Sequence, residues 1–344
     1  MLKPRLFAEA ELLQKLTDLG DPLEVFARCI DFTAWAEAAD KAVPRGQSEQ
    51  GGRPPFPTLL MVKILFLKQL YNCSDDKLEF WIADRRSFRR FLGLEHTSET
   101  PDAKTIANYN NLLAQAEVGK DFFDAALRQV EQAGFIPRGG QMVDASIVPA
   151  PTPHIKREER EKLENGETPE DWSDAKARQH DPDARWTKKN GKSYFGYKVH
   201  VNVDHRYKFV RALIVTPANV NDTCCFEDLL GENTSSEVIA DRGYAKQERE
   251  ESLKEQGATP RIQRKGEKNK PLSECQKKRN SKIAKKRARV EHPFAALEEM
   301  GGKFVRVVRG KRASFAIHMK VAIYNLRRLC FFKGRMGAAQ DTCV

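Results

Sequence analysis

The spacing of apolar residues near the start of the chain predicts short helices. In AEAELLQKLTDLG (8–20) and along residues 21–43, apolar side chains recur every three to four positions. Asp21 followed by Pro22 is typical of a helix start, because an Asp side chain caps the first turn and Pro tolerates the first helical position. We therefore expect helical structure in both segments.

The same periodicity continues after a break in composition. Residues 46–55 (GQSEQGGRPP) have the Gly and Pro content of a linker. From Pro57 to about Gly93 the pattern is helical again, and Ser74 is the expected N-cap of one helix. Residues 98–117 and 121–134 add two further helices. The first 135 residues are thus predicted to be all-helical.

The pattern then changes to alternation with β-branched residues. GGQMVDASIVPAP (139–151) predicts a strand, and residues 152–193 are polar and Pro-containing, which indicates a long loop. Residues 193–219 alternate as a hairpin with a turn at HRYK. EVIAD (237–241) predicts a fourth strand, followed by a helix and a fifth short strand at 258–265.

Helices return at the C-terminal end. A basic tract at 266–289 leads into a helix, which residues 289–302 are expected to continue to a stop at Gly301-Gly302. A last amphipathic helix is predicted over 314–332. Antiparallel strands, a strand–helix–strand unit and a terminal helix predict a mixed sheet flanked by helices, the element order of the ribonuclease-H-like fold.

The net charge of the chain indicates which class of partner it can bind. The chain has 344 residues, a formal net charge of +11 and 40% hydrophobic residues, enough to build a core. A basic protein of this size suggests a polyanionic partner, usually nucleic acid. The alternative is a basic surface with no such partner.

Several classes of protein are disfavoured. The seven cysteines include no CxxC pair, which argues against a disulfide framework or a zinc site and for a reducing compartment. The N-terminal residues lack the apolar core of a signal peptide. The most apolar stretch, 58–71, is interrupted by Lys63 and Lys68 and is too short for a membrane span. There is no GxxxxGK[ST] loop, so no nucleotide cofactor is expected.

Three acids are candidates for catalysis. Asp144 and Asp241 each end an apolar run, and Glu291 is expected on a helix. An Asp at a strand end is more often only a turn former or a cap. Together, however, three carboxylates match the requirement of phosphodiester cleavage for two Mg²⁺ ions held by oxygen ligands.

These segments carry a resemblance to a known family. The stretches at 183–204, TPANVNDT (216–223), VIADRGY (238–244) and ARVEHPFAAL (288–297), in this order, resemble insertion-sequence DDE transposases of the IS-five family. The resemblance covers most of residues 57–330. It implies a ribonuclease-H-like catalytic domain in which Asp144, Asp241 and Glu291 are the acidic, metal-binding triad.

The match to the family is incomplete around the last acid. The family often has a Tyr–Arg–Glu–Lys helical signature, in which Arg287 and Glu291 match here. Ala284 and Glu298 stand where the family has Tyr and Lys, which leaves a phosphate-binding role at position 298 open. The alternatives for that role are Lys303, Arg306 and Arg309.

Basic residues near the acids are candidates for DNA contacts. The tract 276–289 holds eight Lys or Arg in 14 residues. In the segment 185–198, basic residues alternate with aromatic ones. A solvated charge run is the alternative for the first, and core packing for the aromatics of the second. The predicted DNA-binding residues are Trp186, Lys188, Lys189, Lys192, Lys198, Arg242, Lys285, Lys286, Arg287, Arg289, Arg306 and Arg309.

The resemblance implies a transposase that cleaves the ends of an insertion sequence and joins the 3′-hydroxyl to target DNA, with two Mg²⁺ ions or Mn²⁺. We expect residues 1–135 to bind terminal inverted repeats in duplex DNA and to help form a homodimer. Residues 136–334 would be catalytic and 335–344 a flexible tail. A cytoplasmic, nucleoid-associated bacterial protein is expected, with no membrane partner. A non-transposing metal-dependent nuclease and a non-catalytic, transposase-derived regulator remain alternatives.

Overall fold

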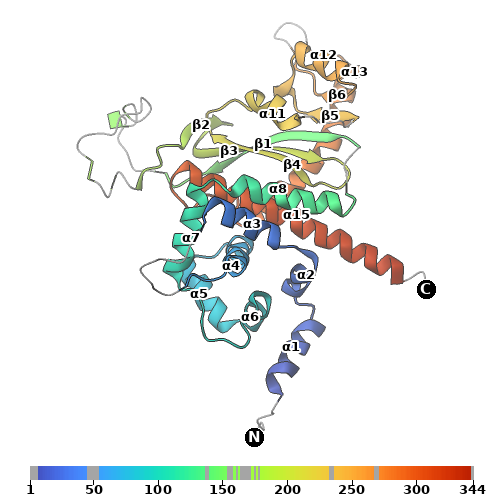
Figure 1. The fold of residues 1–344 in the computed structure, drawn as a ribbon. Helices are drawn as coiled ribbons and strands as arrows, with labels where there is room; N and C mark the ends of the chain where they lie inside the picture. The colour runs from blue at the N-terminus through green and yellow to red at the C-terminus, as the bar shows by residue number, and fades with distance from the viewer. Residues whose placement is uncertain are drawn as a thin grey trace. The chain divides into compact units, whose positions relative to one another are not determined.

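The computed structural model describes residues 7–44, 54–135, 139–152, 179–231, 236–266 and 271–341, with a few isolated positions between 158 and 176. The chain divides into two compact units (Figure 1). Unit 1 comprises residues 1–132 and 322–344, and unit 2 comprises residues 133–321. The long helix α15 (Gly310–Asp341) begins in unit 2 and ends in unit 1.

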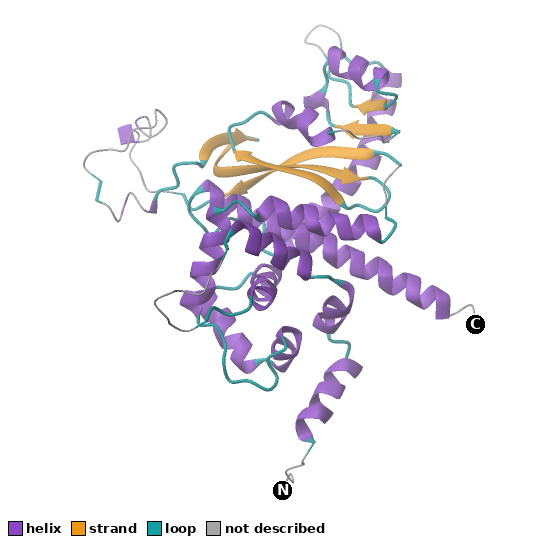
Figure 2. Cartoon of the chain, in the orientation of Figure 1, coloured by secondary structure: helices purple, strands orange, loops and turns teal. Residues whose placement is uncertain are grey.

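Unit 1 is helical, as the sequence predicts (Figure 2). The segment 21–43 forms two short helices. Asp21, Ser74 and Asp102 cap α2, α5 and α7 by accepting backbone N–H groups through their side chains. The helices are α1 (Ala8–Asp18), α2 (Pro22–Cys29), α3 (Thr33–Ala42), α4 (Thr58–Tyr71), α5 (Asp75–Asp84), α6 (Arg86–Leu92), α7 (Ala103–Gln115) and α8 (Gly119–Gln132).

The core of unit 1 is built around α4. Phe66 of this helix is fully buried and lies edge-on to Phe26 and Phe32. Trp35 and Phe122 stack in parallel with ring centroids 4.9 Å apart. Aromatic pairs of this kind add to the free energy gained by burial alone. None of the described helices is long and apolar enough to cross a membrane.

Unit 2 contains one mixed sheet. Strand β3 (Lys192–Asp204) pairs antiparallel with β1 (Gln141–Pro149) and with β4 (Val210–Pro217). Strand β1 also pairs in parallel with β5 (Glu237–Ala240), which pairs in parallel with β6 (Thr259–Ile262). This mixed α+β architecture is that of a ribonuclease-H-like domain, as predicted.

Helices of unit 2 follow the strands closely. After β4 come the 3₁₀ turn η1 (Asp222–Cys225) and α11 (Phe226–Leu230), and after β5 the turn η2 (Arg242–Tyr244) and α12 (Gln247–Glu255). Phe226, Leu253 and Tyr244 pack with Val143 and Val238 of the sheet in one buried cluster. Three further elements precede α15: α13 (Glu274–Arg287), η3 (Ala288–Val290) and α14 (Glu291–Glu299).

Three sequence expectations need correction. The loop expected at 152–193 contains a strand, β2 (Arg185–Lys189), which pairs with the start of β3; most of residues 153–178 lie outside the described residues. The helix expected to run through 266–302 is broken at η3. The last helix is longer than predicted, since α15 reaches Asp341 and continues into the segment expected as a tail. The domain boundaries themselves stay a prediction.

Candidate active site

Asp144 is delivered by the central part of β1. It lies two residues after Met142, on the same face of the strand, because side chains alternate along a strand. Its side chain is 15% exposed. Its Oδ1 accepts a hydrogen bond from the N–H of Ala145 at 2.9 Å. The carboxylate is therefore held at a fixed orientation beside the sheet.

Asp241 follows the last residue of β5 and caps the turn η2. Its Oδ1 accepts the backbone N–H of Gly243 at 2.7 Å. A Cβ atom at position 243 would lie 3.0 Å from that same oxygen. The glycine thus leaves room for the carboxylate to keep its position. The sequence leaves open whether Asp241 only starts a turn or also supplies a carboxylate to a site; the structure shows that it caps the turn, and its role as a site residue stays a prediction.

Glu291 begins α14 and is exposed. The helix α13 does not continue through this point, since η3 separates the two helices and lies against β1. Pro293 stands in the first turn of α14, where a missing N–H costs no helical hydrogen bond. The break places Glu291 at a helix start beside β1 rather than in the middle of a long helix.

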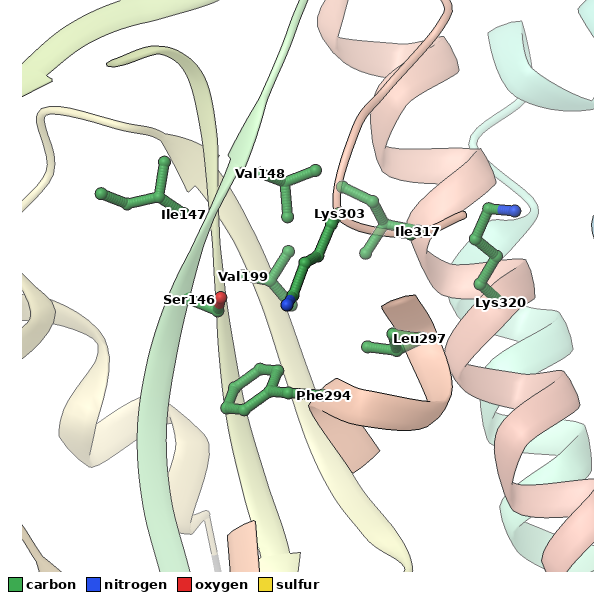
Figure 3. A pocket seen from close by; sticks show the side chains of 10 residues that line it. Ser146, Ile147, Val148, Val199, Phe294, Leu297, Lys303, Ile317 and Lys320 are labelled. Atoms are coloured by element: carbon green, nitrogen blue, oxygen red, sulfur yellow. The ribbon is translucent and has the colours of Figure 1, made fainter. Parts of the chain in front are cut away.

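A small pocket shows how α14 packs on the sheet (Figure 3). Phe294 and Leu297 of α14 line it together with Ser146 and Val199 of the sheet. Its volume is about 20 Å³, room for about one water molecule. Lys320 of α15 donates to the carbonyl of Met300 at 2.5 Å and so caps the end of α14. These contacts fix the helix that carries Glu291 against the strand that carries Asp144.

The three acids share one electrostatic neighbourhood. Burial raises the pKa of Asp144 to about 6. The guanidinium of Arg287 and the N–H of Ala145 oppose this rise, whereas the charges of Asp241 and Glu291 add to it. Asp241 and Glu291 thus act on the charge of Asp144 through space, and the assignment of the three acids to one catalytic site stays a prediction.

Arg287 occupies the open side of Asp144. Its Nη1 donates to Oδ2 of Asp144 at 2.6 Å, and the two side chains are 27% and 15% exposed. The Nε of Arg287 is buried and has no hydrogen-bond partner among the described residues. The sequence predicts a DNA phosphate as the partner of Arg287, and the partner that the structure gives it is a carboxylate.

The donor set fits a hard divalent cation in its chemistry. All three groups are carboxylates, the ligands that Mg²⁺ prefers, and Asp144 already pairs with a positive charge, the guanidinium of Arg287. Within the described residues, however, no three His, Cys, Asp or Glu side chains are arranged around a metal position. Cation binding by all three acids would require their side chains to move from the positions described here.

Tyr244 is the buried residue of the turn that Asp241 caps. It is 1% exposed and its ring packs against Phe226 with centroids 5.4 Å apart. Burial, and then the charges of Asp222, Asp144 and Asp241, raise the pKa of Tyr244 well above its usual value. The ring packs in the buried cluster that contains Val143 and Ala240, which directly precede the two aspartates, and this is the packing role expected from sequence.

The predicted DNA-binding residues fall into two groups. Lys188, Lys189 and Lys192 are exposed on the β2–β3 hairpin, while Trp186 is half-buried against Phe195. The second group consists of exposed residues that lie near the acids or after α14 in the chain: Arg242, Lys285, Arg289, Arg306 and Arg309. Their roles in DNA binding stay predictions.

Two of the lysines predicted to bind DNA form ion pairs within the protein. Lys198 is largely buried, pairs with Asp222 at 2.7 Å and donates to the carbonyl of Val220 at 2.6 Å. Lys286 pairs with Glu237 at 2.8 Å. Lys303, an alternative for the role left open at position 298, forms an ion pair with Glu298 itself. That contact neutralises the glutamate that departs from the family signature.

The comparisons with known proteins identify the family. The family described as "Transposase DDE domain" matches residues 140–326, and the family described as "Transposase domain (DUF772)" matches residues 10–112. The first match covers more than half of the chain, so the protein belongs to the DDE transposases. No solved structure matches the chain.

Proposed function

We propose that the protein is an insertion-sequence transposase of the IS-five type. It would cut a phosphodiester bond at each end of its element and join the freed 3′-hydroxyl to target DNA. Asp144, Asp241 and Glu291 are the proposed catalytic carboxylates. The observation that supports this most strongly is geometric: the parallel register pairs Met142 with Ile239, two residues before Asp144 and Asp241, and η3, which directly precedes Glu291, packs against β1.

These carboxylates would hold two Mg²⁺ ions, or Mn²⁺, which when bound lower the pKa of an attacking oxygen and stabilise a departing one. Asp144 and Asp241 each have one oxygen tied to a backbone N–H, so the other oxygen is oriented for a ligand. Arg287 is placed to exchange its carboxylate partner for a DNA phosphate, because guanidinium binds both groups in the same fork geometry. Substrate binding would then free Asp144.

We propose duplex DNA as the substrate, at terminal inverted repeats and at the target site. Unit 1 would bind the repeats and contribute to a homodimer that holds two ends together. The net charge of +11 supports a DNA partner. Light scattering of the protein with and without end DNA would measure the dimer.

The function is tested by cleavage and joining of DNA that carries both ends of the element. Asp241→Asn should lower the cleavage rate by on the order of a thousandfold while leaving DNA affinity nearly unchanged. Asp228→Asn, at an exposed position on α11, is the matched control and should cleave normally. Cleavage at the normal rate by Asp241→Asn in Mg²⁺ would show that the site is assigned wrongly.

Joined products separate the proposal from its rivals. A nuclease on the same fold would cut the ends and yield no strand-transfer product. A DNA-binding regulator would bind the ends and cut nothing. The presence of all three acids favours an enzyme over a regulator, since binding to DNA alone does not need a cluster of negative charge.

A further inference from the structure

A positively charged surface lies between α13 and β6, apart from the three acids. A groove of about 660 Å³ is bounded by Arg261 of β6 and by residues of α13. Its remaining lining residues are Cys275, Lys278, Arg279, Lys282, Ile283 and Lys286. We call this surface the α13 groove. Of the seven described residues that line it, five are cations and none is acidic.

The lysines of the α13 groove form a stripe. Lys278, Lys282 and Lys286 are four residues apart, so they lie on one side of α13, and all three are exposed. Like charges at this spacing destabilise a helix by about 0.2–0.5 kcal/mol per pair. The stripe therefore opposes helix stability and needs another explanation.

The positive charge of the groove is only partly neutralised. Glu237 pairs with Lys286 at 2.8 Å and with Arg261 at 3.3 Å. Among the residues that the structure describes, neither Lys278 nor Lys282 has an acidic partner. The groove thus carries an excess of positive charge.

The α13 groove is separate from the acidic site. Arg287, which pairs with Asp144, directly follows Lys286, and successive helical residues point about 100° apart. One side of α13 therefore faces the catalytic carboxylates and another side lines the groove. A molecule that fills the groove would not need to displace Arg287.

We infer that the α13 groove binds the phosphodiester backbone of duplex DNA at a point away from the bond being cut. The stripe from Lys278 to Lys286 spans about 12 Å at 1.5 Å per residue, which covers about three phosphates of one strand at 3.4 Å each along the axis. The identity of the polyanion as DNA rests on the proposed function. The groove itself would hold DNA whether or not the acids cleave it.

The lining favours a backbone over a nucleotide. Sites for nucleotides and other small molecules are usually lined by apolar and aromatic side chains with a few polar groups. Among the described lining residues, Ile283 and Cys275 are the uncharged ones, and none has an aromatic ring to stack on a base. Contacts of lysine to phosphate are independent of base sequence.

The first test measures duplex affinity against salt concentration by fluorescence anisotropy. Each lost phosphate contact should reduce the slope of log affinity against log salt by about 0.9, so Lys278→Ala with Lys282→Ala should reduce it by about 1.8. Lys254→Ala, which removes one exposed lysine from α12, is the control and should leave the slope unchanged. An unchanged slope in the double variant would overturn the inference.

The second test uses Cys275, an exposed free thiol in the groove. Duplex DNA should slow its alkylation by a maleimide at least about tenfold, measured on the peptide by mass spectrometry. A cysteine introduced at the exposed Glu255 should react at the same rate with and without DNA. Protection by inorganic phosphate or ATP but not by duplex DNA would mean a small-ligand site and would refute the inference.

The two proposals fail in different ways. If Asp241→Asn still cleaves DNA while duplex protects Cys275, the catalytic assignment is wrong and the α13 groove stands. If Asp241→Asn abolishes cleavage while Cys275 stays reactive and the salt slope of the double variant is unchanged, the groove is wrong and the catalytic site stands. An unchanged circular dichroism spectrum would show that the double variant is folded.

Discussion

Asp144 and Asp241 occupy equivalent positions on two neighbouring parallel strands. The register pairs Met142 with Ile239, and each acid lies two residues further along the chain, Asp144 within β1 and Asp241 directly after β5. Strand β5 ends at Ala240, so Asp241 stands where the two strands separate. In open sheets, ligands bind beyond the carboxyl ends of parallel strands. The register therefore aligns two acids that are far apart in sequence at the usual location of a site.

The ion pair between Arg287 and Asp144 should stabilise the fold in a pH-dependent way. Burial raises the pKa of Asp144 to about 6, so the folded state is penalised for its charge as the pH rises through 6. Arg287→Ala removes the compensating charge, and should lower the free energy of unfolding by about 1–3 kcal/mol above pH 7. The loss should shrink below pH 6, where Asp144 is protonated.

This effect is measured by unfolding the whole protein in urea and using hydrogen exchange of peptides from β1 as the probe of unit 2. A double-mutant cycle with Asp144→Asn isolates the pair, because Arg287→Ala should cost much less once residue 144 is neutral. Equal costs at pH 5 and pH 8 would contradict the assignment of the effect to Asp144.

Gly243→Ala tests the space around Asp241. The added Cβ would lie 3.0 Å from Oδ1 of Asp241, so the carboxylate or the turn must shift. We expect the cleavage rate to fall about a hundredfold, because a displacement of about 1 Å at a catalytic site lowers the rate by about this factor. DNA affinity should change little. Gly257→Ala, with no atom within 4 Å of its added Cβ but a positive φ, separates backbone strain from crowding of the acid. A fully active Gly243→Ala protein would argue against Asp241 as a catalytic group.

Local patterns were sufficient to predict the strands that carry the acids. The apolar runs before Asp144 and Asp241 form β1 and β5, and the alternation over 193–219 forms the β3–β4 hairpin. Alternation of apolar and polar residues indicates a strand with one buried face, and a short apolar run indicates a strand with both faces buried. Both patterns can be recognised from neighbouring residues alone.

The features of the structure that were not predicted from the sequence are of two kinds. Some have a local signal: Asn190-Gly191, both with positive φ, form the tight turn that joins β2 to β3, and Pro293 marks a new helix start. Others are not local. The bond between Arg287 and Asp144 joins residues 143 positions apart, so no spacing rule along the chain predicts it.

Divalent cations should stabilise the protein through the acids. A ligand that binds only the folded state raises the free energy of unfolding by about 2.7 kcal/mol at a concentration a hundred times its Kd. Mn²⁺ or Mg²⁺ should thus raise the Tm of the wild type, and EDTA should reverse the rise. Asp144→Asn and Asp241→Asn should abolish it, while Asp228→Asn should not. An equal rise in all four proteins would place the cation elsewhere.

His200 should make the sheet sensitive to acid. It is fully buried in β3, and its Nε2 lies 2.9 Å from the hydroxyl of Thr216. Burial lowers the pKa of His200 to about 4; Asp222 opposes this shift and Lys198 adds to it. Because the unfolded chain binds the proton more tightly, stability is lost as the pH falls from about 6.5 towards 4, by about 3 kcal/mol in total.

His200→Gln keeps a polar group beside Thr216 and removes the titration. Between pH 6.5 and 4.5, hydrogen exchange of β3 peptides should accelerate in the wild type more than in the variant, after correction for the intrinsic rate. The comparison is made as a difference, since Asp144 titrates in the same window with the opposite sign. His96→Gln, at an exposed position, should behave as the wild type. Identical pH profiles for the wild type and His200→Gln would mean that His200 accepts its proton without opening the sheet.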